Sequence, residues 1–87
     1  MTNRELFLRA LARTRAYRST HRPSLRLESV EKQLEYLLAI EDGKERDRTR
    51  LDDINVGRIA VHEIEGSDET LAELLHQANA AARAMPR

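Results

Sequence analysis

The chain has 87 residues and carries fifteen basic and fifteen acidic side chains, so its formal net charge is zero. A chain of this length forms one domain and buries only about 60–65% of the surface that its unfolded form exposes, so its core is modest. It contains no cysteine, which excludes disulfides, thiolate metal sites and a cysteine nucleophile.

No apolar run approaches the roughly 20 residues that a membrane-spanning helix needs. The first residues, MTNRELFLRAL, lack the long apolar core of a secretory signal. We therefore expect a cytoplasmic protein with no membrane partner.

The charges are unevenly distributed along the chain. Residues 1–26 carry seven arginines and one glutamate, whereas residues 27–75 carry fourteen acidic and six basic side chains. This asymmetry indicates either internal electrostatic complementarity or one charged face that meets a partner. A solvated surface of mixed sign is the plain alternative.

A first helix is predicted over about residues 3–18. Thr2 or Asn3 can cap it, and Glu5 is favourable in its first turn. An apolar stripe recurs at helical spacing through Leu6, Phe7, Ala10, Thr14 and Tyr17. Small polar residues and a proline in residues 19–23 should end the helix.

A second helix is predicted over about residues 25–42, with Ser24 as its N-cap. Its stripe is formed by Leu27, Val30, Leu34, Leu37 and Leu38. Gly43 is well placed to end this helix in a left-handed conformation.

The most apolar run of the chain, residues 51–64, predicts a third helix over about residues 49–65, capped by Asp47 or Thr49. Its apolar residues cover most of the helix circumference, so we expect a central helix with the others packed around it. A strand is the competing interpretation because β-branched residues dominate, but strict alternation fails. Gly57 inside this helix indicates the close approach of a neighbouring backbone.

A fourth helix is predicted over about residues 68–84, after Gly66 and with Ser67 as its N-cap. Its stripe comprises Leu71, Leu74, Leu75, Ala78, Ala81, Ala82 and Met85. Four helices with short connections predict an all-α fold, a small antiparallel four-helix bundle in a single domain.

The residues that could carry chemistry are few. His62 and Glu63 look like the start of a zinc-protease motif, but Gly66 stands where the second histidine is needed. The chain has no glycine-rich phosphate loop, and the serines sit at caps or helix starts. We therefore expect no enzyme, no metal site and no cofactor.

Binding to nucleic acid or to protein remains. The arginines of the first helix could contact phosphates, but the rest of the chain is acidic and aromatic residues are scarce. An acidic helical domain can instead bind a basic protein partner. We expect a protein partner and no nucleic acid.

Two segments carry a family resemblance. Residues 29–36, SVEKQLEY, and residues 51–64, LDDINVGRIAVHEI, resemble the small helical immunity proteins of bacterial type VI secretion. The matching positions are Glu31, Lys32, Gln33, Leu34, Tyr36, Leu51, Gly57, Ile59, Ala60, Val61, Glu63 and Asp68, and the resemblance covers about residues 25–80.

The resemblance implies an all-helical inhibitor that occupies the active site of a cognate effector toxin domain. The best-known member of this family neutralises a secreted NAD(P)+ glycohydrolase. The target could equally be an ADP-ribosylating toxin or another nucleotide-acting effector. The alternative function is a small helical regulator or adaptor, associated with nucleic acid through the arginine-rich first helix.

The candidate toxin-binding residues are acidic side chains near the third helix, which would meet the basic cleft of the toxin: Asp52, Asp53, Glu63, Glu65 and Asp68. Glu31 and Gln33 are added because they match the family motif and should be partly exposed. Each could instead be a helix cap or a solvated residue. The free protein is expected to be a monomer or a weak homodimer.

Overall fold

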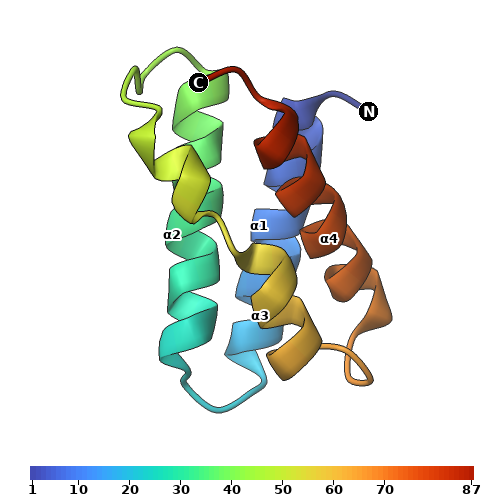
Figure 1. Ribbon diagram of the computed structural model, residues 1–87. Coiled ribbons are helices and arrows are strands. Elements are labelled where there is room, and N and C mark those ends of the chain that lie inside the picture. The colour runs from blue at the N-terminus through green and yellow to red at the C-terminus, as the bar shows by residue number, and fades with distance from the viewer.

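The computed structural model describes all residues 1–87 and has no strands. Its elements are α1 (Asn3–Ser19), α2 (Leu25–Glu41), the short 3-10 helix η1 (Thr49–Asp53), α3 (Val56–Glu63) and α4 (Glu69–Ala84). The four α-helices run alternately up and down in a single bundle (Figure 1). The predicted all-α fold is therefore confirmed.

The predicted start of α1 and the two ends of α2 are confirmed. The Thr2 hydroxyl accepts the Glu5 N–H at 3.1 Å, and the Glu5 carboxylate accepts the Thr2 N–H at 3.1 Å, which together form a capping box. Ser24 accepts the Leu27 N–H at 3.3 Å at the start of α2. After α2, Gly43 adopts a φ of +73°, the left-handed conformation expected of a helix-terminating glycine.

The predicted cap of α4 is wrong by one residue. Asp68, and not Ser67, is the N-cap, and its carboxylate accepts the Leu71 N–H at 3.0 Å. The Ser67 hydroxyl instead accepts a hydrogen bond from the Tyr17 hydroxyl at 3.0 Å. A carboxylate at the N-cap also interacts favourably with the helix dipole, which favours Asp68 over the serine.

The continuous helix predicted over residues 49–65 is also wrong. The segment divides into η1 and α3, with Ile54 extended at a φ of −66° and a ψ of 123° between them. The chain bends here because side chains of α2 and α4 bind the backbone N–H groups of residues 55 and 57. These side chains are distant in sequence, so the helical spacing of residues 51–64 gives no sign of the bend.

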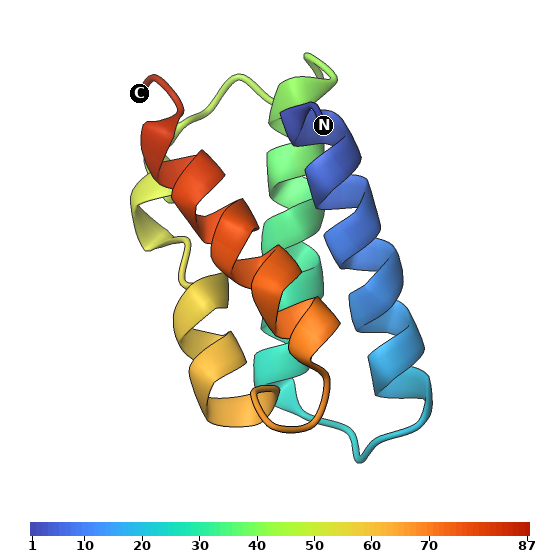
Figure 2. The same ribbon diagram turned by 90° about the vertical axis from the view of Figure 1, so that its right-hand side faces the viewer.

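α3 is not central. It packs against α4 and, less extensively, against α2. Figure 2 shows α4 crossing in front of α2, with α1 along one side and α3 along the other. Val56, Ile59 and Ala60 face these neighbours and are buried, whereas Val61 is 52% exposed. Contact with helices on two sides explains the broad apolar surface of α3 without placing it at the centre.

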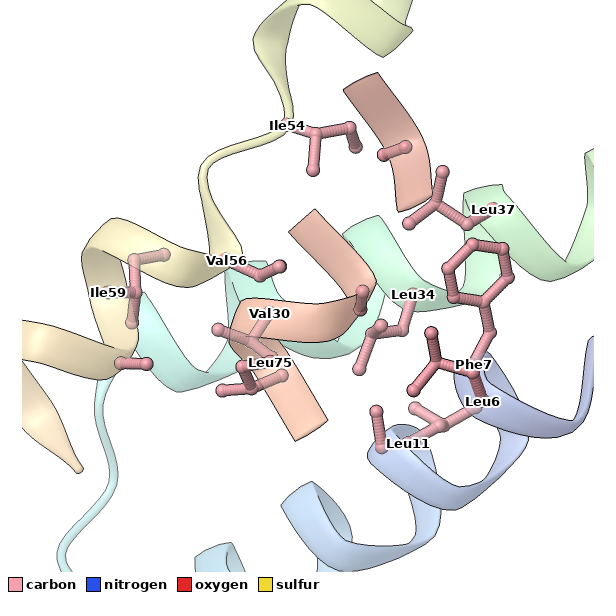
Figure 3. Close-up of a cluster of buried hydrophobic side chains, with 14 of the residues drawn as sticks. Leu6, Phe7, Leu11, Val30, Leu34, Leu37, Ile54, Val56, Ile59 and Leu75 are labelled. Carbon is pink, nitrogen blue, oxygen red and sulfur yellow. The ribbon is translucent and has the colours of Figure 1, made fainter. Parts of the chain in front are cut away.

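The core lies between α1, α2 and α4 and extends under α3. It contains 24 buried apolar residues, and several of the largest, including Phe7, Leu34 and Leu37, are completely buried. Figure 3 shows Phe7 of α1 beside Leu37 of α2, with Ile54 and Val56 reaching in from the η1–α3 segment. Each fully buried side chain of this size stabilises the fold by roughly 1.5–3 kcal/mol.

Candidate functional site

The N-terminus of α3 is held by two other helices. Its N-cap, Asn55, makes no side-chain cap bond of its own. The Gln33 side chain on α2 accepts the Asn55 N–H at 2.8 Å and donates to the Asn55 Oδ1 at 2.7 Å. The Asn79 Oδ1 on α4 accepts the Gly57 N–H at 3.0 Å. These bonds replace a local cap and fix where α3 begins.

The close approach expected at Gly57 exists, but it is made by a side chain and not by a backbone. A Cβ atom on Gly57 would lie 3.2 Å from both the Cβ and the Cγ of Asn79. Glycine therefore lets the Asn79 amide come close enough to bond to the backbone of α3. This is a structural role.

The basic side chains of residues 1–26 pair mostly with acidic side chains of the same molecule. Five of the seven arginines in residues 1–26 form ion pairs with carboxylates of residues 27–75. The pairs are Arg4–Asp42, Arg13–Asp68, Arg15–Glu35, Arg18–Glu28, Arg18–Glu31 and Arg26–Glu63. Internal complementarity is thus confirmed, and most of the basic side chains that a phosphate backbone would need are already paired.

Three of the seven candidate residues hold helices together. Asp68 accepts two hydrogen bonds from Arg13, at 3.0 and 3.1 Å, and these bonds lower the pKa of its carboxyl group. Glu31 pairs with Arg18 at 3.0 Å, and its side chain is only 17% exposed. Gln33 positions α3 as described above. A partner could reach these groups only by breaking contacts within the bundle.

The other four candidates are more accessible. Glu63 pairs with Arg26 at 3.4 Å, Glu65 with His76 at 2.7 Å, and Asp52 with Arg87 at 2.9 Å. Asp53 is exposed and takes part in no ion pair or side-chain hydrogen bond. Asp52 and Asp53 lie on η1, in the upper half of the molecule as drawn in Figure 1, whereas Glu63 and Glu65 lie at the lower end of α3. The seven residues do not form one acidic face.

The structure reveals a different concave surface that the sequence did not identify. A hollow of about 490 Å³, here called the α2–α3 groove, lies between the start of α2 and the length of α3. It is lined by Leu25, Arg26, Ser29, Asn55, Arg58, Ile59 and His62, with no carboxylate among them. The available sequence signal was Leu25, an apolar residue outside the stripe of its helix.

Tyr36, another position of the family motif, fixes the long connection after α2. Its ring is buried, which raises the pKa of its hydroxyl, and the hydroxyl donates to the Asp47 carbonyl oxygen at 2.6 Å. The Arg50 guanidinium lies 4.5 Å from the ring centre, a cation–π contact. This motif residue therefore anchors the segment that leads into η1.

Neither a membrane span nor a metal site is evident in the structure. None of the helices is both long and apolar enough to cross a membrane. No group of three or more histidine, aspartate or glutamate side chains is arranged to hold a metal ion.

The family comparison covers the whole bundle. The Tsi6 family model matches residues 2–84, which adds α1 to the region of resemblance found in the sequence. No curated protein and no solved structure matches the chain. The matched range begins at the Thr2 cap and ends with α4. The chain therefore belongs to the Tsi6 family, a family of type VI secretion immunity proteins that act against NAD(P)+ glycohydrolase toxins.

Proposed function

We propose that this protein binds the toxin domain of one cognate type VI effector and blocks its NAD(P)+-consuming active site. The observation that carries the proposal is the family match over residues 2–84. An inhibitor of this kind acts as a stoichiometric ligand and excludes the substrate by occupying its cleft. It needs no reaction of its own, so a small domain without a cofactor suffices.

The rigidity of the bundle supports this role. The Gln33 and Asn79 bonds fix the start of α3 before any partner arrives. Ion pairs of three α1 arginines connect α1 with α2 and with the N-cap of α4. A preorganised surface loses less conformational entropy on binding than a flexible one, so more of the contact energy appears as affinity.

The exposed acids of η1 are the candidate residues best placed to meet a basic cleft. The Asp52 side chain is 71% exposed, and Asp53 is exposed with no internal partner. Asp52 would have to exchange its bond to Arg87, whereas Asp53 has no bond to break. Carboxylates at this position would complement the positive potential of a site that binds phosphates and would steer association.

The function is tested by isolating the partner. The tagged protein is used to capture its partner from the source organism, and the partner is identified by mass spectrometry. Its toxin domain is then assayed for NAD(P)+ consumption at increasing ratios of this protein. We expect activity to reach zero at an equimolar ratio. A toxin partner that leaves NAD(P)+ intact would keep the immunity role but refute the proposed substrate, and recovery of only nucleic acid or housekeeping proteins would refute the role.

The contribution of η1 is tested by reversing its charges. The double variant Asp52→Lys and Asp53→Lys should weaken toxin binding, mainly through a slower association that depends more weakly on salt. Glu73→Lys is the matched control because Glu73 is also an exposed acid, but on α4, where its carboxylate accepts a hydrogen bond only from Gln77. Unchanged affinity of the double variant, with an intact helical spectrum, would remove η1 from the interface.

A further inference from the structure

We propose that the α2–α3 groove receives a segment of the toxin domain that combines a carboxylate with an apolar side chain. This inference rests on the proposed function, because it names the part of the molecule that contacts the same partner. It assigns a basic and apolar contact surface, distinct from the acidic residues selected from the sequence.

The charge of the groove identifies the polar half of its occupant. Arg58 on α3 takes part in no ion pair and no side-chain hydrogen bond, whereas six other arginines of the chain are paired. Arg26 meets only Glu63, which does not line the groove, at 3.4 Å. His62 adds an imidazole to the two guanidinium groups. A carboxylate of the partner is the group that would form charge-assisted hydrogen bonds here.

The rim of the groove identifies the apolar half. Leu25, which lines the groove at the start of α2, is 83% exposed. It is the most exposed large apolar side chain of the chain. Aliphatic side chains around an arginine exclude water from its bonds, which is the arrangement typical of residues that dominate binding energy.

The groove is already formed in the free protein. Gln33 holds Asn55 at its upper end through two hydrogen bonds and also donates to the Ser29 hydroxyl at 3.0 Å. Ile59 in its wall is buried in the core cluster. Binding therefore requires little rearrangement of the backbone, only the ordering of Leu25 and Arg58.

A stable protein interface is larger than the groove alone, so we expect it to include η1 as well. Specific protein complexes bury about 800 Å² on each partner, roughly a seventh of the 5442 Å² surface of this protein. Such a footprint extends beyond the seven groove residues onto the segment that precedes Asn55, where Asp53 lies. The toxin should accordingly present an acidic segment to the groove beside the basic cleft that faces η1.

The test measures the affinity of four single variants for the effector toxin domain isolated as described above, by calorimetry. Arg58→Ala should raise Kd by about 30-fold and Leu25→Ala by about 10-fold, as expected for central interface residues. Arg9→Ala and Leu8→Ala are the matched controls: Arg9 is likewise unpaired, Leu8 is 39% exposed, and both lie on α1. The controls should change Kd less than threefold. Helical spectra and melting temperatures verify that all four variants fold.

The outcomes separate this inference from the proposed function. If the wild-type protein inhibits the toxin and all four variants bind equally well, the groove is not the contact surface, although the immunity function stands. If the wild-type protein does not bind the toxin domain, the proposed function fails and the groove assignment fails with it. If light scattering shows a dimer that Leu25→Ala dissociates without changing toxin affinity, the occupant is a second copy of this chain and the inference is wrong.

Discussion

Asn79→Ala should loosen α3 specifically. The change removes the acceptor of the Gly57 N–H, a partly buried bond of 3.0 Å. Leaving such a donor unpaired costs about 1–3 kcal/mol of unfolding free energy. Because water can partly reach the Gly57 N–H, we expect a cost in the lower half of that range. Alanine recovers about 0.5 kcal/mol through its higher helix propensity in α4. The net loss is about 1 kcal/mol.

A loss of this size is measurable by two methods. For a domain of 60–100 residues it lowers the melting temperature by about 4–8 °C. Because α3 has only eight residues and helices this short do not persist alone, the amides of residues 56–64 should exchange about 5-fold faster while those of α1 are less affected. Hydrogen exchange followed by mass spectrometry resolves the two regions.

The control is Gln77→Ala on the same helix. Gln77 is exposed, and its amide bonds only to Glu73 at 2.9 Å, so its removal should change stability by less than about 0.5 kcal/mol. If Asn79→Ala leaves both the melting temperature and the exchange of α3 unchanged, then the bond to Gly57 does not hold α3 in place and the reasoning is refuted.

Three further predictions concern stability. Gly43→Ala should destabilise the fold by about 1 kcal/mol in urea titration, because alanine is strained at a φ of +73° although nothing lies within 4 Å of the added Cβ; an unchanged midpoint would contradict the left-handed turn. Leu34→Ala should lower the free energy of unfolding by about 2–5 kcal/mol, since Leu34 is completely buried. Leu25→Ala should lower it by less than about 0.5 kcal/mol. Equal losses of stability in the two variants would contradict the assigned core. The pKa of Asp68 is lowered, first of all by its hydrogen bonds from Arg13. The ionised carboxylate therefore stabilises the fold fully above the unfolded-state pKa of about 4, and this stabilisation is lost as the pH falls below that pKa. Asp68→Asn should therefore lower the melting temperature at pH 7 more than at pH 3, and equal shifts would contradict the ion pair.

Helix positions followed from local signals in the sequence. Apolar residues at helical spacing located all four helical regions, and Thr2, Ser24 and Gly43 marked their ends, because capping depends on residues within one turn. The break at Ile54 and Asn55 could not be found in this way. It depends on Gln33 and on an α4 side chain, which reach this segment only in the folded bundle.

The internal partners of the candidate residues could not be predicted from the sequence, for a related reason. The sequence shows which residues are acidic, but not which of them are already paired. Asp68 is neutralised by Arg13, 55 positions away, and Glu31 by Arg18 on another helix. The resemblance likewise selected Gln33, whose side chain positions α3. Asp68, Glu31 and Gln33 thus make contacts between elements of the bundle, which the sequence alone does not show.

The separation between paired and unpaired side chains has a consequence for diversification and design. None of the eight ion pairs of the protein involves Leu25, Arg58 or His62, which line the groove. These three positions can therefore mutate, in nature or in a randomised library, while every interhelical ion pair remains intact. A single scaffold could then be retargeted from one toxin to another by changes at the groove alone, without a compensating change elsewhere in the bundle.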